Sequence, residues 1–254
     1  MGKIIAVANQ KGGVGKTTTC VNLACALEQA GQRPLLCDFD PQGNSTSGFG
    51  VSKQASPNVY DILFGGIEPG KAVVRTRYGD LLPANKSLSG ADIELAALER
   101  REYRLKDALE QLRAQYGYIL IDCPPSLGLL TLGGLCAADT VLVPVQCEYY
   151  ALEGLSDLMH TIRLVRKSLN TALDIEGILL TMFDARTNLS TQVAEEVKRH
   201  FPGKIFKTVV PRNVRLSEAP SHGKPVQYYD SASRGADCYT ALAGELVRRN
   251  GGTA

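Results

Sequence analysis

Short apolar runs alternate along the chain with longer stretches in which apolar residues recur at helical spacing. Six runs predict β-strands that are apolar on both faces, at residues 4–8, 34–38, 118–122, 140–145, 175–182 and 205–211. Five stretches predict helices, at residues 17–30, 91–115, 151–169, 189–200 and 231–249. Strands of this kind separated by helices favour the α/β class, a mostly parallel twisted sheet with helices on both faces.

The stretch from residue 41 to residue 90 follows neither pattern and is rich in Gly, Ser and Asn. We expect it to form a long, mobile surface insertion. The sequence contains no internal repeat, low-complexity tract or Pro/Ser-rich linker. We therefore predict a single domain over residues 1–254.

Composition and charge exclude several classes of protein. The formal net charge of +2 fits neither an acidic tail nor a generally basic nucleic-acid coat, although it divides into −3 over residues 1–159 and +5 over residues 160–254. The 7 cysteines form no C-x-x-C pair and predict buried, reduced thiols. No apolar run approaches the ~20 residues of a membrane span and no signal-peptide layout opens the chain, so we expect a cytoplasmic protein.

The strongest chemical signal is the segment K-G-G-V-G-K-T-T between the first predicted strand and the first predicted helix. Successive glycines let backbone N–H groups wrap an anion, and the helix N-terminus adds a favourable dipole. A standard P-loop has glycine where this chain has Gln10, so the motif is a variant; the alternative is a glycine-rich turn with incidental lysines. The predicted nucleotide-binding residues are Lys11, Gly12, Gly13, Val14, Gly15, Lys16, Thr17 and Thr18.

Within this loop, Lys16 is expected to contact the β- and γ-phosphates, and the Thr17 hydroxyl to ligate Mg²⁺. Two predicted strands end in carboxylates at the sheet edge where ligands bind in α/β folds: Asp38 and Asp40 after one, Asp122 after the other. Paired with a P-loop, Asp122 is expected to hold Mg²⁺ through its water shell, with support from Asp38. Each aspartate alone could instead cap a helix or form a turn.

The motif K-G-G-x-G-K-T resembles the signature of the deviant Walker A ATPases, which have the P-loop NTPase fold. Similarity to one branch, the ParA/Soj partitioning proteins, extends over nearly the whole chain. It is carried by A-N-Q at residues 8–10, D-P-Q-G-N at 40–44, P-P-S-L-G at 124–128, E-Y-Y-A-L-E-G-L at 148–155, and P-R-N to G-K-P across 211–225.

This resemblance implies roles that the residues alone do not establish. Asp40 would orient the attacking water, and Pro211 and Asn213 would lie near the adenine. Lys11 would reach the nucleotide of a facing subunit, so that ATP joins two copies into a homodimer; a solvated surface lysine is the alternative. The loop of residues 126–130 would couple nucleotide state to the dimer surface.

The resemblance also implies that the ATP-bound dimer binds double-stranded DNA without sequence preference, on the nucleoid, and that a ParB-like DNA-binding partner accelerates slow hydrolysis. Arg186 and Arg215 match family positions assigned to DNA contact; the alternative is a surface or intramolecular ion pair. Possible helpers are Lys198, Arg199, Lys204, Arg248 and Arg249. Because the first predicted strand starts near residue 3, we do not expect an N-terminal DNA-reading domain.

Three related functions are alternatives. An ATPase that positions a protein cargo on the nucleoid would use the same chemistry. A MinD-like membrane positioner would need a C-terminal amphipathic helix, which the Gly-Gly at residues 251–252 disfavours. An iron–sulfur carrier would need cluster cysteines, and the sequence shows no C-x-x-C pair.

Overall fold

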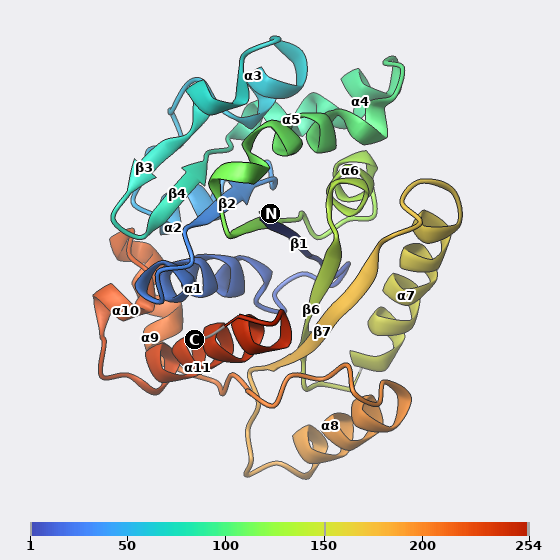
Figure 1. Ribbon diagram of the computed structural model, residues 1–254. Coiled ribbons are helices and arrows are strands. Elements are labelled where there is room, and N and C mark those ends of the chain that lie inside the picture. Colours follow the sequence, from blue (N-terminus) through green and yellow to red (C-terminus); the bar gives the residue numbers. More distant parts are fainter. Residues whose placement is uncertain (1, 150, 253–254) are drawn as a thin grey trace.

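The computed structural model describes residues 2–149 and 151–252, and within them the strands form one sheet in the order β3-β4-β2-β5-β1-β6-β7 (Figure 1). Adjacent strands are parallel, except that β3 pairs antiparallel with β4 at one edge. The predicted α/β class and mostly parallel sheet are therefore confirmed. The strands are β1 (Lys3–Val7), β2 (Pro34–Asp38), β3 (Val74–Thr76), β4 (Gly79–Leu82), β5 (Tyr118–Asp122), β6 (Thr140–Gln146) and β7 (Asp174–Thr181).

Alternate residues of the central strands face opposite layers of helices. In β1, Ile5 and Val7 pack in the layer with α1 (Lys16–Gln29) and α11 (Arg234–Arg249). Ile4 and Ala6 pack on the other face, in the layer formed mainly by α5 (Arg104–Leu112), α6 (Leu129–Ala137), α7 (Ala151–Ser168) and α8 (Asn188–His200). Burial on both faces explains why these strands are uninterrupted apolar runs in the sequence.

Shorter helices fill the connections around the sheet. They are α2 (Asn44–Gly48), α3 (Val59–Phe64), α4 (Ala91–Ala96), α9 (Val214–Glu218) and α10 (Val226–Tyr229). Single 3₁₀ turns are η1 (Pro69–Ala72), η2 (Lys86–Gly90), η3 (Arg101–Tyr103), η4 (Arg113–Gln115) and η5 (Ala219–His222).

Two predictions of secondary structure were wrong in the first half of the chain. The stretch 41–90 contains two strands, and β4 is hydrogen-bonded to β2 inside the sheet. The single helix predicted over 91–115 is divided into α4, η3, α5 and η4 by a turn in which Arg100 adopts a left-handed backbone conformation, with φ 52°. No Gly or Pro marks this break in the sequence, so the helical spacing runs through it.

The strand predicted over residues 205–211 was also wrong. Isolated bridges join Ile205 and Pro211 to the β7 side of the sheet, but no continuous ladder forms between them. The backbone amides of Lys207 and Thr208 donate instead to the Glu245 carboxylate of α11, at 2.8 and 2.9 Å. Because two successive amides of this segment bond to a side-chain carboxylate and not to a neighbouring strand, the segment is irregular.

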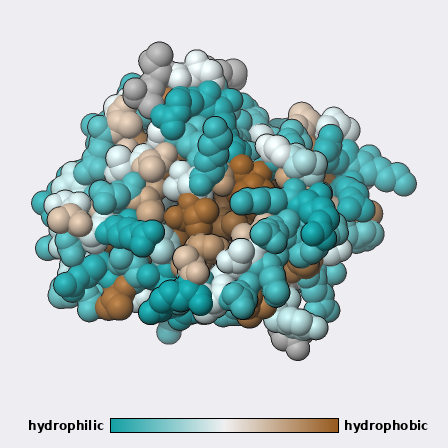
Figure 2. Space-filling view, turned by 90° about the horizontal axis from the view of Figure 1, so that it is seen from below, coloured by the Kyte–Doolittle hydropathy of each residue, from teal (hydrophilic) through white to brown (hydrophobic). Residues whose placement is uncertain are grey.

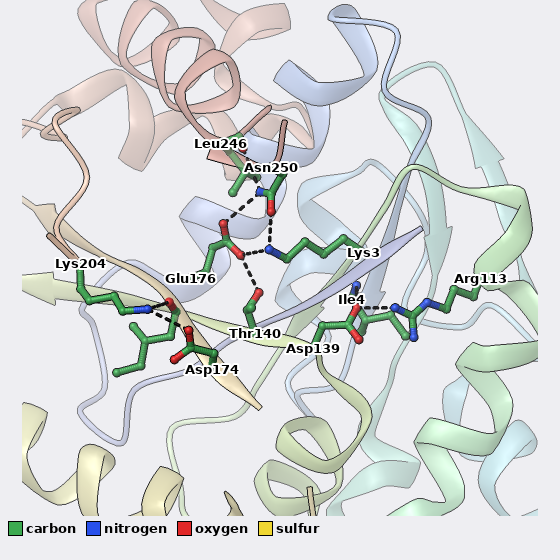
Figure 3. A network of polar contacts seen from close by, with 11 residues as sticks. Lys3, Ile4, Arg113, Asp139, Thr140, Asp174, Glu176, Lys204, Leu246 and Asn250 are labelled. Carbon is green, nitrogen blue, oxygen red and sulfur yellow. Dashed lines mark hydrogen bonds and ion pairs between the residues drawn. The ribbon is translucent and has the colours of Figure 1, made fainter. Parts of the chain in front are cut away.

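A polar network joins the two ends of the described chain at the amino edge of the sheet (Figure 3). The Glu176 carboxylate of β7, whose side chain is 4% exposed, pairs with the Lys3 ammonium of β1 and accepts from Thr140 of β6. Asn250, just beyond α11, donates to Glu176 at 3.0 Å and accepts from Lys3. The carboxyl edge of the same strands carries the residues described next.

Candidate nucleotide site

The loop between β1 and α1 is shaped by two glycines with positive φ. Gly13 has φ 75° and Gly15, the N-cap of α1, has φ 90°, conformations that side chains rarely adopt. No side chain of the described residues caps α1, and its first turn carries no acidic residue. The N–H groups that begin α1 are thus left for an external acceptor, as in a helix that binds an anion.

Lys16 lies inside this loop and is only 7% exposed. Its ammonium group donates to the Lys11 carbonyl at 3.1 Å and, within the described chain, has no carboxylate within ion-pair distance. Burial lowers the pKa of Lys16, against the opposing influence of Asp122 and Asp40. A buried cation with a single carbonyl acceptor is suited to meet a polyphosphate.

The predicted carboxylates Asp38 and Asp122 lie side by side, because they are register partners at the ends of adjacent parallel strands. Both are fully buried. Burial raises the pKa of each carboxyl group, and the charge of Asp122 adds to the rise at Asp38. For Asp122, the hydrogen bond from Ser45, the nearby Thr17 hydroxyl and the charge of Lys16 oppose the rise.

One oxygen of this pair fits a bound cation. Asp122 Oδ2 accepts from Ser45 at 2.7 Å, whereas Oδ1 is buried without a hydrogen-bond partner in the described chain. Buried polar atoms normally have a hydrogen-bond partner. Oδ1 therefore remains available to a donor or a cation that a ligand would bring. No group of three or more His, Cys, Asp or Glu among residues 2–149 and 151–252 could hold a metal alone. A metal here would take most ligands from water and nucleotide.

Asp40 lies in the loop after β2 and is 8% exposed. Its side chain accepts from the Gln42 amide at 2.9 Å, and its carbonyl from the Gly43 amide at 2.9 Å. These bonds fold the loop tightly beside the aspartate pair. The structure thus brings the P-loop, Asp38, Asp40 and Asp122 to one end of the sheet.

An apolar cavity of about 330 Å³ adjoins the P-loop. Pro211 and Asn213, both predicted to lie near the adenine, are among its lining residues. The Asn213 side chain also caps α9, accepting from the Arg215 amide at 2.9 Å. The other lining residues include Gly15, Thr18, Met182, Leu216 and Tyr239. A concave, mostly apolar cavity beside an anion-binding loop has the form of a site for a base and sugar.

Lys11 is not a freely solvated lysine. Its ammonium group lies 3.2 Å from the Glu148 carboxylate of the same chain, with the lysine side chain 34% exposed. Lys11 also lines an open groove with Gln10, Ser126 and Leu127, residues of the P-loop and of the loop before α6. The lysine therefore lies beside the predicted coupling loop, and its present partner is a carboxylate within the chain.

The two arginines predicted to contact DNA lie on the surface and are ion-paired. Arg186, whose side chain is 88% exposed, donates twice to Asp184, at 2.9 and 2.7 Å. Arg215 of α9 pairs with Glu218 at 2.8 Å and with Asp230 at 3.1 Å. Neither is bonded to the phosphate-site residues among the described interactions. A DNA phosphate would have to compete with these carboxylates.

Several polar residues of the site were missed by sequence reasoning. Thr46 is fully buried and bonds to Asp38 at 2.7 Å, and Thr181 at the end of β7 donates to the Val14 carbonyl of the P-loop at 2.9 Å. Met182 lines the cavity with φ 50°, a conformation uncommon outside glycine. The position of Thr181 at the end of a strand was the available signal.

In the view from below Figure 1 most of the surface is hydrophilic, and hydrophobic residues gather near its middle (Figure 2). No helix in residues 2–149 and 151–252 combines the length and the apolar character needed to cross a bilayer.

Comparison with known proteins reveals extensive similarity. A family model described as an AAA domain matches residues 2–175. The chain is 60% identical to the sporulation initiation inhibitor protein Soj of Bacillus subtilis, over 97% of this chain and 99% of that protein. It is 54% identical to the chromosome partitioning protein ParA of Myxococcus xanthus, over 98% of this chain and 89% of that protein.

Among solved structures, the chain is similar to cobyrinic acid a,c-diamide synthase from Mycobacterium smegmatis with bound ADP and magnesium. The TM-score is 0.86 at 40% identity, covering 99% of this chain and 96% of that chain.

Proposed function

Because this chain belongs to the ParA/Soj family of deviant Walker A ATPases, we propose that it is an ATP-driven dimerisation switch for chromosome or plasmid partitioning, with residues 1–254 acting as one ATPase domain. The observation that carries the proposal is the combination of an uncapped P-loop helix, the buried Lys16 and an unpartnered oxygen of Asp122 beside an apolar cavity. Similarity to partitioning proteins over nearly the whole chain supports the cellular role.

ATP is the proposed ligand, with its phosphates on residues 11–18 and its base in the cavity lined by Pro211 and Asn213. Magnesium, when bound, would neutralise charge between the β- and γ-phosphates. Thr17 and Asp122 would hold it, supported by Asp38. The orphaned Asp122 oxygen and the relative solved with ADP and magnesium both support this assignment.

Hydrolysis is proposed to depend on three residues of this chain. Asp40 orients the attacking water, and Lys16 compensates the negative charge that develops on the transferred phosphoryl group. In the homodimer, Lys11 of each subunit adds positive charge at the facing subunit's nucleotide. To do so, Lys11 would have to leave the Glu148 carboxylate with which it pairs within its own chain.

The ATP-bound dimer is proposed to bind double-stranded DNA without sequence preference on the nucleoid, and to be released when a ParB-like partner accelerates hydrolysis. Arg186 and Arg215 are the proposed DNA contacts. Their exposure supports this role, and because both are ion-paired, DNA binding would exchange a carboxylate for a phosphate. Exchange of partners makes such binding strongly dependent on salt.

Two other functions are compatible with the same nucleotide chemistry. The alternative of a cargo-positioning ATPase shares every step except the partner. Amidation of cobyrinic acid, suggested by the name of a relative at 40% identity, is disfavoured because the partitioning relatives are 60% and 54% identical. Release of phosphate from ATP in the absence of any corrinoid or amide donor would count against amidation; the partner separates partitioning from cargo positioning.

The decisive experiment uses Asp40→Ala. The substitution spares the P-loop contacts and removes the group that orients water, so the variant is expected to bind ATP, dimerise, remain on unrelated DNA duplexes and hydrolyse little. Size-exclusion chromatography, mobility shift and phosphate release measure these properties. Asp107→Ala on α5 is the matched control and should behave like the wild type. An Asp40→Ala variant that stays monomeric with ATP, where the wild type dimerises, contradicts the proposal.

A further inference from the structure

The first turn of α2 holds Asp38 and Asp122, two of the three aspartates of the site. Ser45 donates its hydroxyl to Asp122 at 2.7 Å, and the next residue, Thr46, donates its hydroxyl to Asp38 at 2.7 Å. Both residues are fully buried. Thus a five-residue helix, too short to be stable alone, is fastened by its side chains to the ends of β5 and β2.

Thr46 makes the more extensive contact. Asp38 Oδ2 accepts from the backbone amide of Thr46 as well as from its hydroxyl, each at 2.7 Å. The same hydroxyl accepts from the Ala84 amide just beyond β4, at 2.9 Å. The Thr46 hydroxyl thereby donates one hydrogen bond to the end of β2 and accepts another from the segment just beyond β4.

The bond between Asp38 and Thr46 closes the loop that contains Asp40. The two partners are eight residues apart, and the chain between them turns through Asp40 to Gly43, where φ is 60°. A closed loop of this length restricts the positions open to Asp40. Misplacing a catalytic group by about 1 Å can cost on the order of 100-fold in rate.

We infer that Thr46 is a positioning residue of the phosphate site, which fixes the loop bearing Asp40 by holding the Asp38 carboxylate. Thr46 touches neither nucleotide nor water in this role and acts through Asp38. The kinetic consequence rests on the proposed ATP hydrolysis, whereas the effect on the loop does not.

The test compares Thr46→Val, which keeps the shape and removes the hydroxyl, with Thr46→Ser, which keeps the hydroxyl. Ser47→Ala is the control, because in the described chain the Ser47 hydroxyl bonds only to the carbonyls of Gly43 and Asn44 and not to an aspartate. The first readout is hydrogen exchange of the amides of residue 40 and residues 42–46 in nucleotide-free protein, since Pro41 has no amide hydrogen. The second is the dissociation constant for ATP measured beside kcat.

In Thr46→Val the loop amides should exchange at least about tenfold faster, because local opening is no longer opposed by the side-chain bonds. Its kcat should fall at least about tenfold, with the dissociation constant for ATP within about threefold of wild type. Thr46→Ser should restore most of both losses, and Ser47→Ala should match the wild type.

Unchanged exchange of the loop amides in Thr46→Val would overturn the inference, as would equal losses in the Val and Ser variants. Should Thr46→Val fail to fold, Asp38→Ala replaces it, since it removes the other partner and must also accelerate exchange of the loop. If the wild type hydrolyses no ATP, the proposed function fails, while the exchange measurements still decide the role of Thr46.

Discussion

Lys16 is held in a position that is unfavourable without a ligand. Burial takes its ammonium group out of water, and only the Lys11 carbonyl receives it among the described residues. The resulting lowered pKa shows that the charged form is penalised in the nucleotide-free state. Bound phosphates would remove that penalty, so part of the binding free energy is prepared by the fold.

Lys16→Ala should therefore abolish high-affinity ATP binding while leaving the nucleotide-free protein at least as stable. We expect affinity to fall by more than about 100-fold, since losing one partner of a buried ion pair costs about 3–5 kcal/mol. Titration calorimetry with ATP measures the loss, and Lys71→Ala, an exposed lysine of η1, is the control. Normal ATP hydrolysis by Lys16→Ala would show that the P-loop is assigned wrongly.

Glu245 is a second buried charge, and its role is structural. It accepts from the amides of Lys207 and Thr208 and from the Thr208 hydroxyl, and it pairs with Arg249 at 2.7 Å. Burial would raise the pKa of Glu245, but the hydrogen bonds outweigh it and lower the pKa below the ordinary 4.5. A carboxyl group whose pKa is depressed in the folded state stabilises the protein at pH values above its unfolded-state pKa. That stabilisation is lost as the pH falls through the folded-state pKa.

Glu245→Gln should destabilise the protein in a way that depends on pH. At about pH 7 we expect the free energy of unfolding to fall by about 1 kcal/mol, the value for charged hydrogen bonds discounted for partial solvent screening. Below about pH 4 the unfolded-state carboxyl is protonated while the folded-state carboxyl, with its lower pKa, still resists protonation, so the difference between variant and wild type should shrink. Urea unfolding from about pH 7 to below about pH 4 measures the difference in the free energy of unfolding between variant and wild type. A difference that does not change with pH would contradict the structural role of the Glu245 charge.

At the scale of elements, prediction from sequence succeeded where an apolar run was long. The strands β1, β2 and β5 were predicted within one residue of their observed bounds because both faces of each are buried. β3 and β4 were missed, since three and four residues are too few to show a period. α6 was missed because it is apolar on nearly every side and so lacks amphipathic spacing.

The residues of the nucleotide site likewise divide into those that the sequence predicts and those that only the fold reveals. The P-loop was predicted because its residues are contiguous and their geometry depends on local glycines. Thr46 and Thr181 were not, because their partners lie eight and 167 residues away and only the fold brings them together. Sequence likewise could not show that Arg215 pairs with Asp230, which meets it only through the packing of α9 against α10. The other partners, Asp184 and Glu218, lie within three residues of their arginines and fit the ion-pair alternative.

The element that carries Arg215 offers a test of the DNA surface. Arg215→Ala should reduce the salt slope of DNA affinity by about 1 and weaken binding about equally on all sequences. Arg215→Glu should weaken binding further, by repelling the phosphates, while ATP binding and dimerisation continue. Mobility shift on unrelated duplexes with ATP, beside a dimerisation assay, measures both, and Arg75→Glu on the edge strand β3 is the control.

Unchanged DNA binding in Arg215→Glu would remove Arg215 from the DNA surface. Loss of DNA binding only together with loss of the dimer would do the same, because α9 would then act through the fold. Since Glu218 and Asp230 would repel the new carboxylate, circular dichroism and nucleotide affinity must accompany the measurement.

At the scale of the whole molecule, polar networks occupy both ends of the sheet and serve different purposes. The carboxyl edge carries the nucleotide site with its orphaned oxygen, whereas the amino edge carries Glu176 with both oxygens engaged by Lys3, Thr140 and Asn250. A satisfied buried network stabilises one arrangement of the fold. The amino-edge network should therefore affect stability without affecting ATP.

Glu176→Gln should lower the free energy of unfolding by about 2 kcal/mol, because it leaves the partly buried Lys3 without its counter-ion. The dissociation constant for ATP should stay within about twofold, as the substitution lies at the opposite edge of the sheet. Chemical denaturation and calorimetry measure the two quantities. Glu68→Gln, whose pair with Lys71 at 3.7 Å is exposed, should change stability by less than about 0.5 kcal/mol. Equal effects of the two substitutions would contradict the role of the network.

The contact between Lys3 and Asn250 also makes the chain almost a closed ring. Residues 247 positions apart in sequence touch through their side chains, so a short flexible linker from residue 252 to residue 2 would span the amino edge without crossing the nucleotide site. New ends could then be opened at the exposed turn of Pro202 and Gly203. Such a circular permutant would keep the order of strands in space, but the ribosome would make α9, α10 and α11 before β1 instead of after β7.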